Sequence, residues 1–193
     1  MDNLSPERVR EFVIAGHGDL AKVQAMLAET PELLSAAHEW KPGDTETAIQ
    51  GASHVGNAAI AEHLLAQGAP LAIYTAAMLG RVQEVRGMLE EDPSLAQEKG
   101  AHGIPLLPHA AFAGNVELME SLAEAGATEG SSMALGFAAG GGHIQVVRWL
   151  LENLELNLSW QNFQSKTPLQ LATEGGHTVV AELLQQYAHG KPA

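Results

Sequence analysis

The chain has 193 residues, and its 10 lysines and arginines against 23 aspartates and glutamates give a formal net charge of −13. A surface of this charge repels nucleic-acid phosphates and anionic lipids, so neither nucleic acid nor a membrane is an expected partner. No cysteine is present, which excludes disulfides, thiol catalysis and cysteine-based zinc sites and is typical of a reducing compartment.

The first segment, MDNLSPERVREF, has charges where a secretory signal needs an apolar stretch, and no run of about 18 apolar residues follows it. We therefore expect a cytoplasmic protein. Ser5 can cap a helix whose first turn contains Pro6 and Glu7. The sequence predicts that this helix runs to about Ala15.

A repeated phrase follows along the chain. Each copy starts at a glycine and continues with apolar residues at helical spacing, as in GRVQEVRGML and GHIQVVRWLL. A short alanine-rich helix is predicted before each later glycine, so the unit is a helical hairpin that must stack on its neighbours to bury its apolar face. The six anchoring glycines are Gly18, Gly56, Gly80, Gly114, Gly142 and Gly176.

Long and short connections alternate between these hairpins, since successive glycines are 38, 24, 34, 28 and 34 residues apart. The three long junctions are rich in turn-forming residues and precede Thr47, Pro105 and Thr167. They predict about three projecting β-hairpin or loop fingers on one domain that covers residues 1–193.

The sequence TPLQLA at 167–172, followed by Gly176-His177 and by Leu183-Leu184, resembles the ankyrin repeat. The resemblance extends over nearly the whole chain and implies an all-α solenoid of stacked helical hairpins. The usual ankyrin repeat is about 33 residues long. The 24- and 28-residue intervals depart from it and imply missing fingers and a more open concave face.

The resemblance also implies that the fingertips and the last turn of each inner helix line the binding face. The mixture of residues there is apolar and aromatic with a few polar groups, which suits a protein or peptide segment. The acidity of the chain predicts that this partner is neutral or basic, and we expect the protein to be a monomer. We expect no catalytic residue, cofactor or metal. The nominated partner-binding residues are Trp40, His54, Met78, Ala101, His102, Ile104, Phe112, Phe163, Gln164, Lys166 and Glu174, with His17 and Val55 in similar positions.

Nine histidines invite a metal hypothesis, but no two of them have the three- or four-residue spacing usual for zinc ligands on a helix. The resemblance implies that His143 and His177, which follow anchoring glycines, bond across the turn. Among the aromatic residues, Phe163 is expected to be exposed, whereas Trp40 and Trp160 are either pinned on the fold or exposed for a partner.

Two alternatives remain open. The chain could be an enzyme or a small-molecule binder that uses the space left by the missing fingers, with His54, His102 and Glu174 as acid–base groups. It could also be a structural subunit that docks through an apolar end of the stack. The polar last helix weakens that second alternative.

Overall fold

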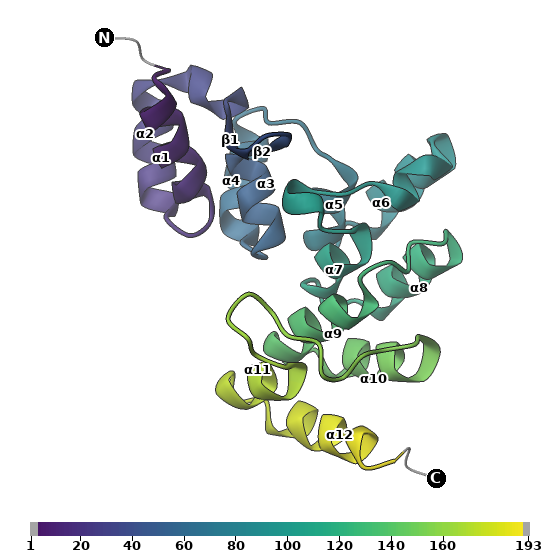
Figure 1. Cartoon of the computed structure of the whole chain (residues 1–193). Helices are drawn as coiled ribbons and strands as arrows, with labels where there is room; N and C mark the ends of the chain where they lie inside the picture. The colour runs from purple at the N-terminus through teal and green to yellow at the C-terminus, as the bar shows by residue number, and fades with distance from the viewer. Residues whose placement is uncertain (1–3, 191–193) are drawn as a thin grey trace.

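The computed structural model describes residues 4–190, which form a stack of helical hairpins with one small sheet (Figure 1). Each hairpin has an inner helix, which precedes the glycine turn, and an outer helix, which follows it. The predicted all-α repeat solenoid is therefore confirmed. The inner helices are α1 (Pro6–Gly16), α3 (Ala48–His54), α5 (Ile73–Met78), α7 (Leu106–Ala111), α9 (Ser131–Gly140) and α11 (Pro168–Glu174).

The outer helices bury one apolar face each, as their sequence phrases predict. In α10, for example, Val146, Val147, Leu150 and Leu151 are buried at helical spacing. Between residues 4 and 190, no helix combines the length and the apolarity needed to cross a bilayer. The outer helices are α2 (Leu20–Glu29), α4 (Ala58–Ala66), α6 (Val82–Glu91), α8 (Val116–Glu124), α10 (Ile144–Asn153) and α12 (Thr178–Ala188).

The turns inside the hairpins depend on glycine. Five of the six anchoring glycines have φ between 65° and 74°, a region that residues with a Cβ enter at a cost. Gly18, in the first hairpin, is the exception. After the last of these turns, His177 Nε2 donates a hydrogen bond to the carbonyl oxygen of Gly140 at 3.0 Å. The expected bond across the turn is thus confirmed for His177.

The apolar core divides into two clusters along the stack. We call residues 4–69 the N-terminal block, whose core includes the fully buried Phe12 and Leu64. Residues 73–190 form the C-terminal block, which has a separate core around residues such as Leu135. Each inner helix contacts the next inner helix, and the hairpins follow one another along a curved stack (Figure 1).

The two blocks meet where α3 contacts α5. Gln50 Nε2 donates a hydrogen bond to Tyr74 Oη at 3.0 Å, and the hydroxyls of Ser53 and Thr75 bond to each other at 2.8 Å. Ser53 and Thr75 are fully buried, so their mutual bond satisfies groups that would be costly to leave unpaired. Specific hydrogen bonds therefore fix this junction in addition to packing.

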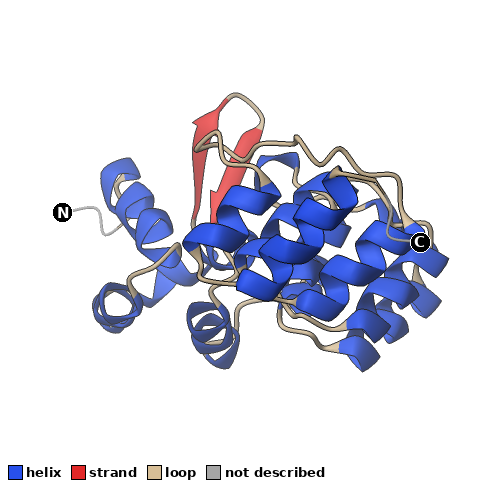
Figure 2. Cartoon of the chain, turned by 90° about the horizontal axis from the view of Figure 1, so that it is seen from below, coloured by secondary structure: helices blue, strands red, loops and turns tan. Residues whose placement is uncertain are grey.

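The three predicted fingers differ from one another. The first is an antiparallel hairpin of β1 (Ala37–Lys41) and β2 (Asp44–Thr47), which stands out from the helical layer in Figure 2. The second holds a short 3₁₀ turn, η3 (Ala101–Gly103), closed by a bridge between Lys99 and Pro105. The third, before α11, contains turns and no strand among the described residues. Two further 3₁₀ turns, η1 (Pro31–Ser35) and η2 (Pro93–Gln97), follow α2 and α6.

Candidate functional site

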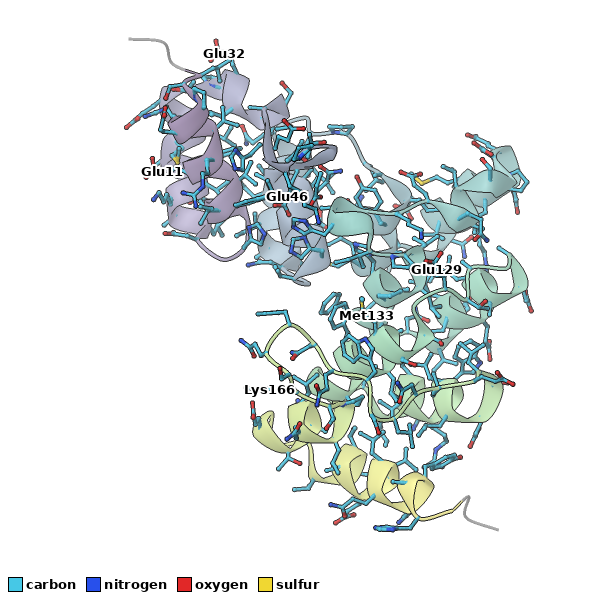
Figure 3. The ribbon with its side chains drawn as sticks, viewed as in Figure 1. Glu11, Glu32, Glu46, Glu129, Met133 and Lys166 are labelled. Atoms are coloured by element: carbon cyan, nitrogen blue, oxygen red, sulfur yellow. The ribbon has the colours of Figure 1, made fainter. Side chains whose placement is uncertain are left out.

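One groove of about 600 Å³ is lined by residues of both blocks. They come from the ends of the inner helices, from the second finger and from the loop before α11, so the groove extends along the stack from the first hairpin to the last. Figure 3 labels Glu46 in the N-terminal block and Lys166 on the loop before α11. The lining residues are His17, His54, Val55, His102, Ile104, Phe112, Phe137 and Phe163.

The C-terminal side of this groove is aromatic. The rings of Phe112 and Phe137 are stacked, with centroids 4.5 Å apart and planes 20° apart. Trp160 meets the edge of Phe137 and lies directly over Gly136, where a Cβ would collide with its ring. Trp160 is thus pinned on the fold, whereas Phe163 is 94% exposed, which confirms the exposure expected for it.

The N-terminal side is polar and is built around one buried carboxylate. Side chains alternate along a strand, so Asp44 and Glu46 of β2 share a face. Glu46 has no exposed surface, and its Oε2 accepts a hydrogen bond from Trp40 Nε1 at 2.6 Å. That bond pins Trp40 on the fold as well.

Three imidazoles surround the other carboxylate oxygen, Glu46 Oε1. His54 Nδ1 lies 3.0 Å from it, His17 Nε2 3.4 Å and His102 Nε2 3.6 Å. His17 ends α1, His54 is the last residue of α3, and His102 sits in η3 with a left-handed backbone (φ 58°, ψ 18°). The ring of His54 lies between the other two. Its centroid is 4.9 Å from that of His17 and 5.1 Å from that of His102. We call these four residues the His–Glu cluster.

The electrostatics of the cluster favour a charged carboxylate. Burial raises the pKa of Glu46, but the neighbouring imidazoles of His17 and His54 outweigh burial and lower this pKa to about 2. In return, Glu46 raises the pKa of His17 above its ordinary value, against a smaller opposing effect of burial. The carboxylate therefore carries its charge in the interior at neutral pH and attracts positive charge to this spot.

Five of the nominated residues lie together on the groove, namely His54, His102, Ile104, Phe112 and Phe163. Two nominations need correction. Met78 and Ala101 are 3% and 4% exposed, so their side chains offer almost no surface to a partner. Met78 instead packs into the core of the N-terminal block, because its long, flexible side chain reaches back across the junction.

The remaining predicted partner-binding residues do not line the groove. Gln164 and Glu174 are exposed and Lys166 is half-buried, and the Lys166 ammonium pairs with the Glu174 carboxylate. The acid–base trio of His54, His102 and Glu174 is therefore not assembled. Trp40 is held by Glu46 and does not line the groove either.

Sequence reasoning missed Glu46, Asp44 and Phe137. The two acids stand in a polar finger, where a solvent-exposed role is the obvious expectation. Phe137 could have been predicted from the sequence. Gly140 stands two residues before its anchoring glycine, the position that His54 and Phe112 have in their repeats, and a residue three places earlier lies on the same helix face. The structure also gathers potential metal ligands: His17, Glu46 and His54 each offer one ligand atom, all within 4.8 Å of one another.

Comparison with protein families matches residues 107–191 to ankyrin repeats (3 copies). Within the described residues, this segment contains the last three hairpins, from α7 to α12. No curated protein matches the chain.

Proposed function

The chain is an ankyrin repeat protein, and we propose that it is a non-catalytic module that binds a protein or peptide segment in the groove. Ankyrin repeats are generally protein–protein interaction modules. Stacked repeats are preformed and lose little conformational freedom on binding, which favours recognition on their concave side. We also propose that the protein is cytoplasmic and monomeric, and that it binds neither nucleic acid nor a membrane.

The observation that carries this proposal is the exposed aromatic residue at the groove. Phe163 is 94% exposed and lines the same apolar surface as the stacked pair Phe112 and Phe137. An apolar surface of this kind is hydrated in the free protein, so covering it with a partner lowers the free energy and favours binding. Aromatic anchors of this type often dominate binding energies.

The charge of the chain restricts the partner. A net charge of −13 favours a neutral or basic segment and disfavours an acidic one. We therefore propose a segment whose apolar side chains enter the groove while its lysines or arginines face the acidic surroundings. Its association rate should fall as the salt concentration rises, because salt screens this attraction.

Site-specific cross-linking tests the location of the contact. A photoreactive phenylalanine analogue at Phe163 should capture a partner from native lysate. The same analogue at Val179, which is 64% exposed on α12, serves as the control. The captured partner, once identified, should bind the Phe163→Ala and Phe112→Ala variants about 10-fold or more weakly, as expected for anchors worth more than 1 kcal/mol. Equal capture at both positions, or undiminished binding by the folded variants, would remove the groove as the binding face.

We propose no catalytic activity. The acid–base trio considered from the sequence required Glu174, and that carboxylate pairs with Lys166 instead of lining the groove. The stronger polar feature is the His–Glu cluster, whose chemistry points in another direction.

A further inference from the structure

We propose that the His–Glu cluster binds a divalent transition-metal ion, with Zn²⁺ as the preferred ion. His17, Glu46 and His54 would be its ligands, and His102 lies beside them. The proposal concerns the floor of the groove and does not depend on the protein partner proposed above. Either proposal can fail without the other.

The first argument is the spacing of the ligand atoms. Zinc binds imidazole nitrogens and carboxylate oxygens at about 2.0–2.2 Å, so neighbouring ligands of a tetrahedral site lie about 3.3 Å apart. The distances from Glu46 Oε1 to His54 Nδ1, His17 Nε2 and His102 Nε2 are 3.0, 3.4 and 3.6 Å. These distances from the carboxylate oxygen lie close to that spacing, and the ligand atoms of His17, Glu46 and His54 all lie within 4.8 Å of one another.

The second argument concerns which ring nitrogens hold hydrogen. His17 Nδ1 lies 3.0 Å from the Val13 carbonyl oxygen, which can only accept, so this nitrogen donates. His102 Nδ1 lies 3.1 Å from Asp44 Oδ2 and likewise donates to the carboxylate. In the neutral rings the lone pair is then on Nε2, the atom near Glu46. Bonds from the far nitrogen to a carbonyl or a carboxylate orient metal-binding histidines in just this way.

The third argument is the unpaired polar atoms. Glu46 Oε1 and His54 Nδ1 are both buried and lack a hydrogen-bond partner among the described residues, although they lie 3.0 Å apart. A buried carboxylate oxygen beside neutral ring nitrogens is unfavourable unless positive charge compensates it, either a proton on one of the rings or a bound cation. A metal ion among these atoms would satisfy all of them at once.

The ligand set indicates the kind of ion. Calcium and magnesium prefer oxygen ligands throughout, whereas imidazole suits zinc, copper, iron and nickel. Two imidazoles with one carboxylate and no thiolate match zinc sites that keep a position for a further ligand. His17, His54 and His102 also line the groove, so a bound ion would be accessible to a group of the partner.

The left-handed backbone at His102 holds its ring in a defined position beside the three ligands. A non-glycine residue rarely adopts this conformation, and such residues are concentrated at functional sites. Here the turn aims the ring back at the first finger, where Asp44 holds it. The cluster thus draws on α1, β2, α3 and η3.

Metal titration of the wild-type protein is the direct test. Chelator-treated, dialysed protein should bind one Zn²⁺ per chain in calorimetry and show no saturable binding of Mg²⁺ or Ca²⁺. Zinc should raise the melting temperature, because an ion that binds only the folded state stabilises it. In protein with ¹⁵N-labelled histidine, the ring signals of His17, His54 and His102 should shift, while those of His63 and His189 stay in place.

Variants then assign the ligands. Glu46→Gln and His54→Ala should weaken Zn²⁺ binding about 100-fold or more, since loss of even an outer-shell partner costs 10–100-fold. His63→Ala, on the outer helix α4, is the matched control and should bind like the wild type. Circular dichroism verifies folding, and if a cluster variant does not fold, the ring shifts in the wild type decide. Absence of saturable Zn²⁺ binding, equal losses in His63→Ala, or shifts at other histidines would each overturn the proposal.

Discussion

The N-terminal and C-terminal blocks are built from the same helical hairpin but fill the space beside their inner helices differently. In the N-terminal block that space holds the buried carboxylate of Glu46 and its histidines. In the C-terminal block it holds the stacked rings of Phe112 and Phe137. The match to ankyrin repeats covers residues 107–191 and includes no residue of the N-terminal block.

This difference separates two tasks that a repeat protein must perform. The regular hairpins of the C-terminal block share one core and account for the likeness to the family, because each repeat contacts only its neighbours. The irregular first finger carries the charged chemistry, and it can do so because the core of its block lies mainly on α1–α4. The groove runs across both regions and thereby joins an apolar surface to a polar one.

The largest effects are expected from cavities in the two cores. Leu135 in α9 and Leu64 in α4 are fully buried, so replacing either with alanine should cost about 4 kcal/mol. If the blocks are separate units, Leu135→Ala should lower amide-exchange protection chiefly in α7–α11, and Leu64→Ala chiefly in α1–α4. Hydrogen exchange followed by mass spectrometry measures both. Equal loss across both blocks in each variant would instead support the predicted single domain over residues 1–193, which stays a prediction until then.

The repeat architecture was predictable from the sequence because its signals are local. The glycine at each turn and the helical spacing of apolar residues lie within one hairpin, and the junction lengths follow from the chain between one hairpin and the next. The exposure of Phe163 followed in the same way from its place in a polar loop. These signals need no knowledge of how one hairpin stacks on another.

The His–Glu cluster was not predictable, because stacking alone creates it. His102 and Asp44 are 58 residues apart in the chain, and no spacing rule links them. A glutamate in the polar segment GDTET also gives no sign that it will be buried. Met78 failed as a nomination for a related reason, since its burial depends on the neighbouring block.

A second, smaller effect concerns pH and the C-terminal block. His109 in α7 is 1% exposed, and burial lowers its pKa to about 4, although its Nδ1 donates a hydrogen bond to the Pro105 carbonyl oxygen. The unfolded chain has a histidine pKa of about 6.5, so protons bind the unfolded state first as the pH falls. The stabilisation that the folded state gains from this difference in pKa is complete above about pH 6.5. The free energy of unfolding then falls by about 3 kcal/mol on acidification to about pH 4, and below that pH this histidine causes no further change.

Urea denaturation at several pH values measures this effect. A His109→Gln variant supplies the control, because it lacks the titrating ring and its own cost does not depend on pH. The difference in unfolding free energy between wild type and variant should change by about 3 kcal/mol between pH 6.5 and pH 4. A constant difference over this range would mean that His109 binds its proton at the same pH in the folded and the unfolded protein.

An intermediate effect should come from the indole that holds Glu46. Trp40→Phe keeps an aromatic ring but removes the N–H that donates to Glu46 Oε2 at 2.6 Å. Because the acceptor is a buried carboxylate, the loss should cost about 2 kcal/mol. Trp160→Phe is the matched control, since Trp160 packs against Phe137 and Gly136. Chemical denaturation compares the two, and a cost for Trp40→Phe no greater than that of the control would contradict the assigned bond.

The smallest effect uses a device that both blocks share. Thr47 caps α3 and Thr167 caps α11, and each forms a capping box with the glutamine three residues later. Thr47→Ala and Thr167→Ala should each cost about 1 kcal/mol in thermal or chemical denaturation, whereas Thr45→Ala, at an exposed position of β2, should stay within about 0.5 kcal/mol of wild type. If Thr47→Ala costs clearly more than Thr167→Ala, the cap also positions Glu46, which precedes it. Equal costs mean that the local signal acts alike in both blocks and that their difference lies in the fingers.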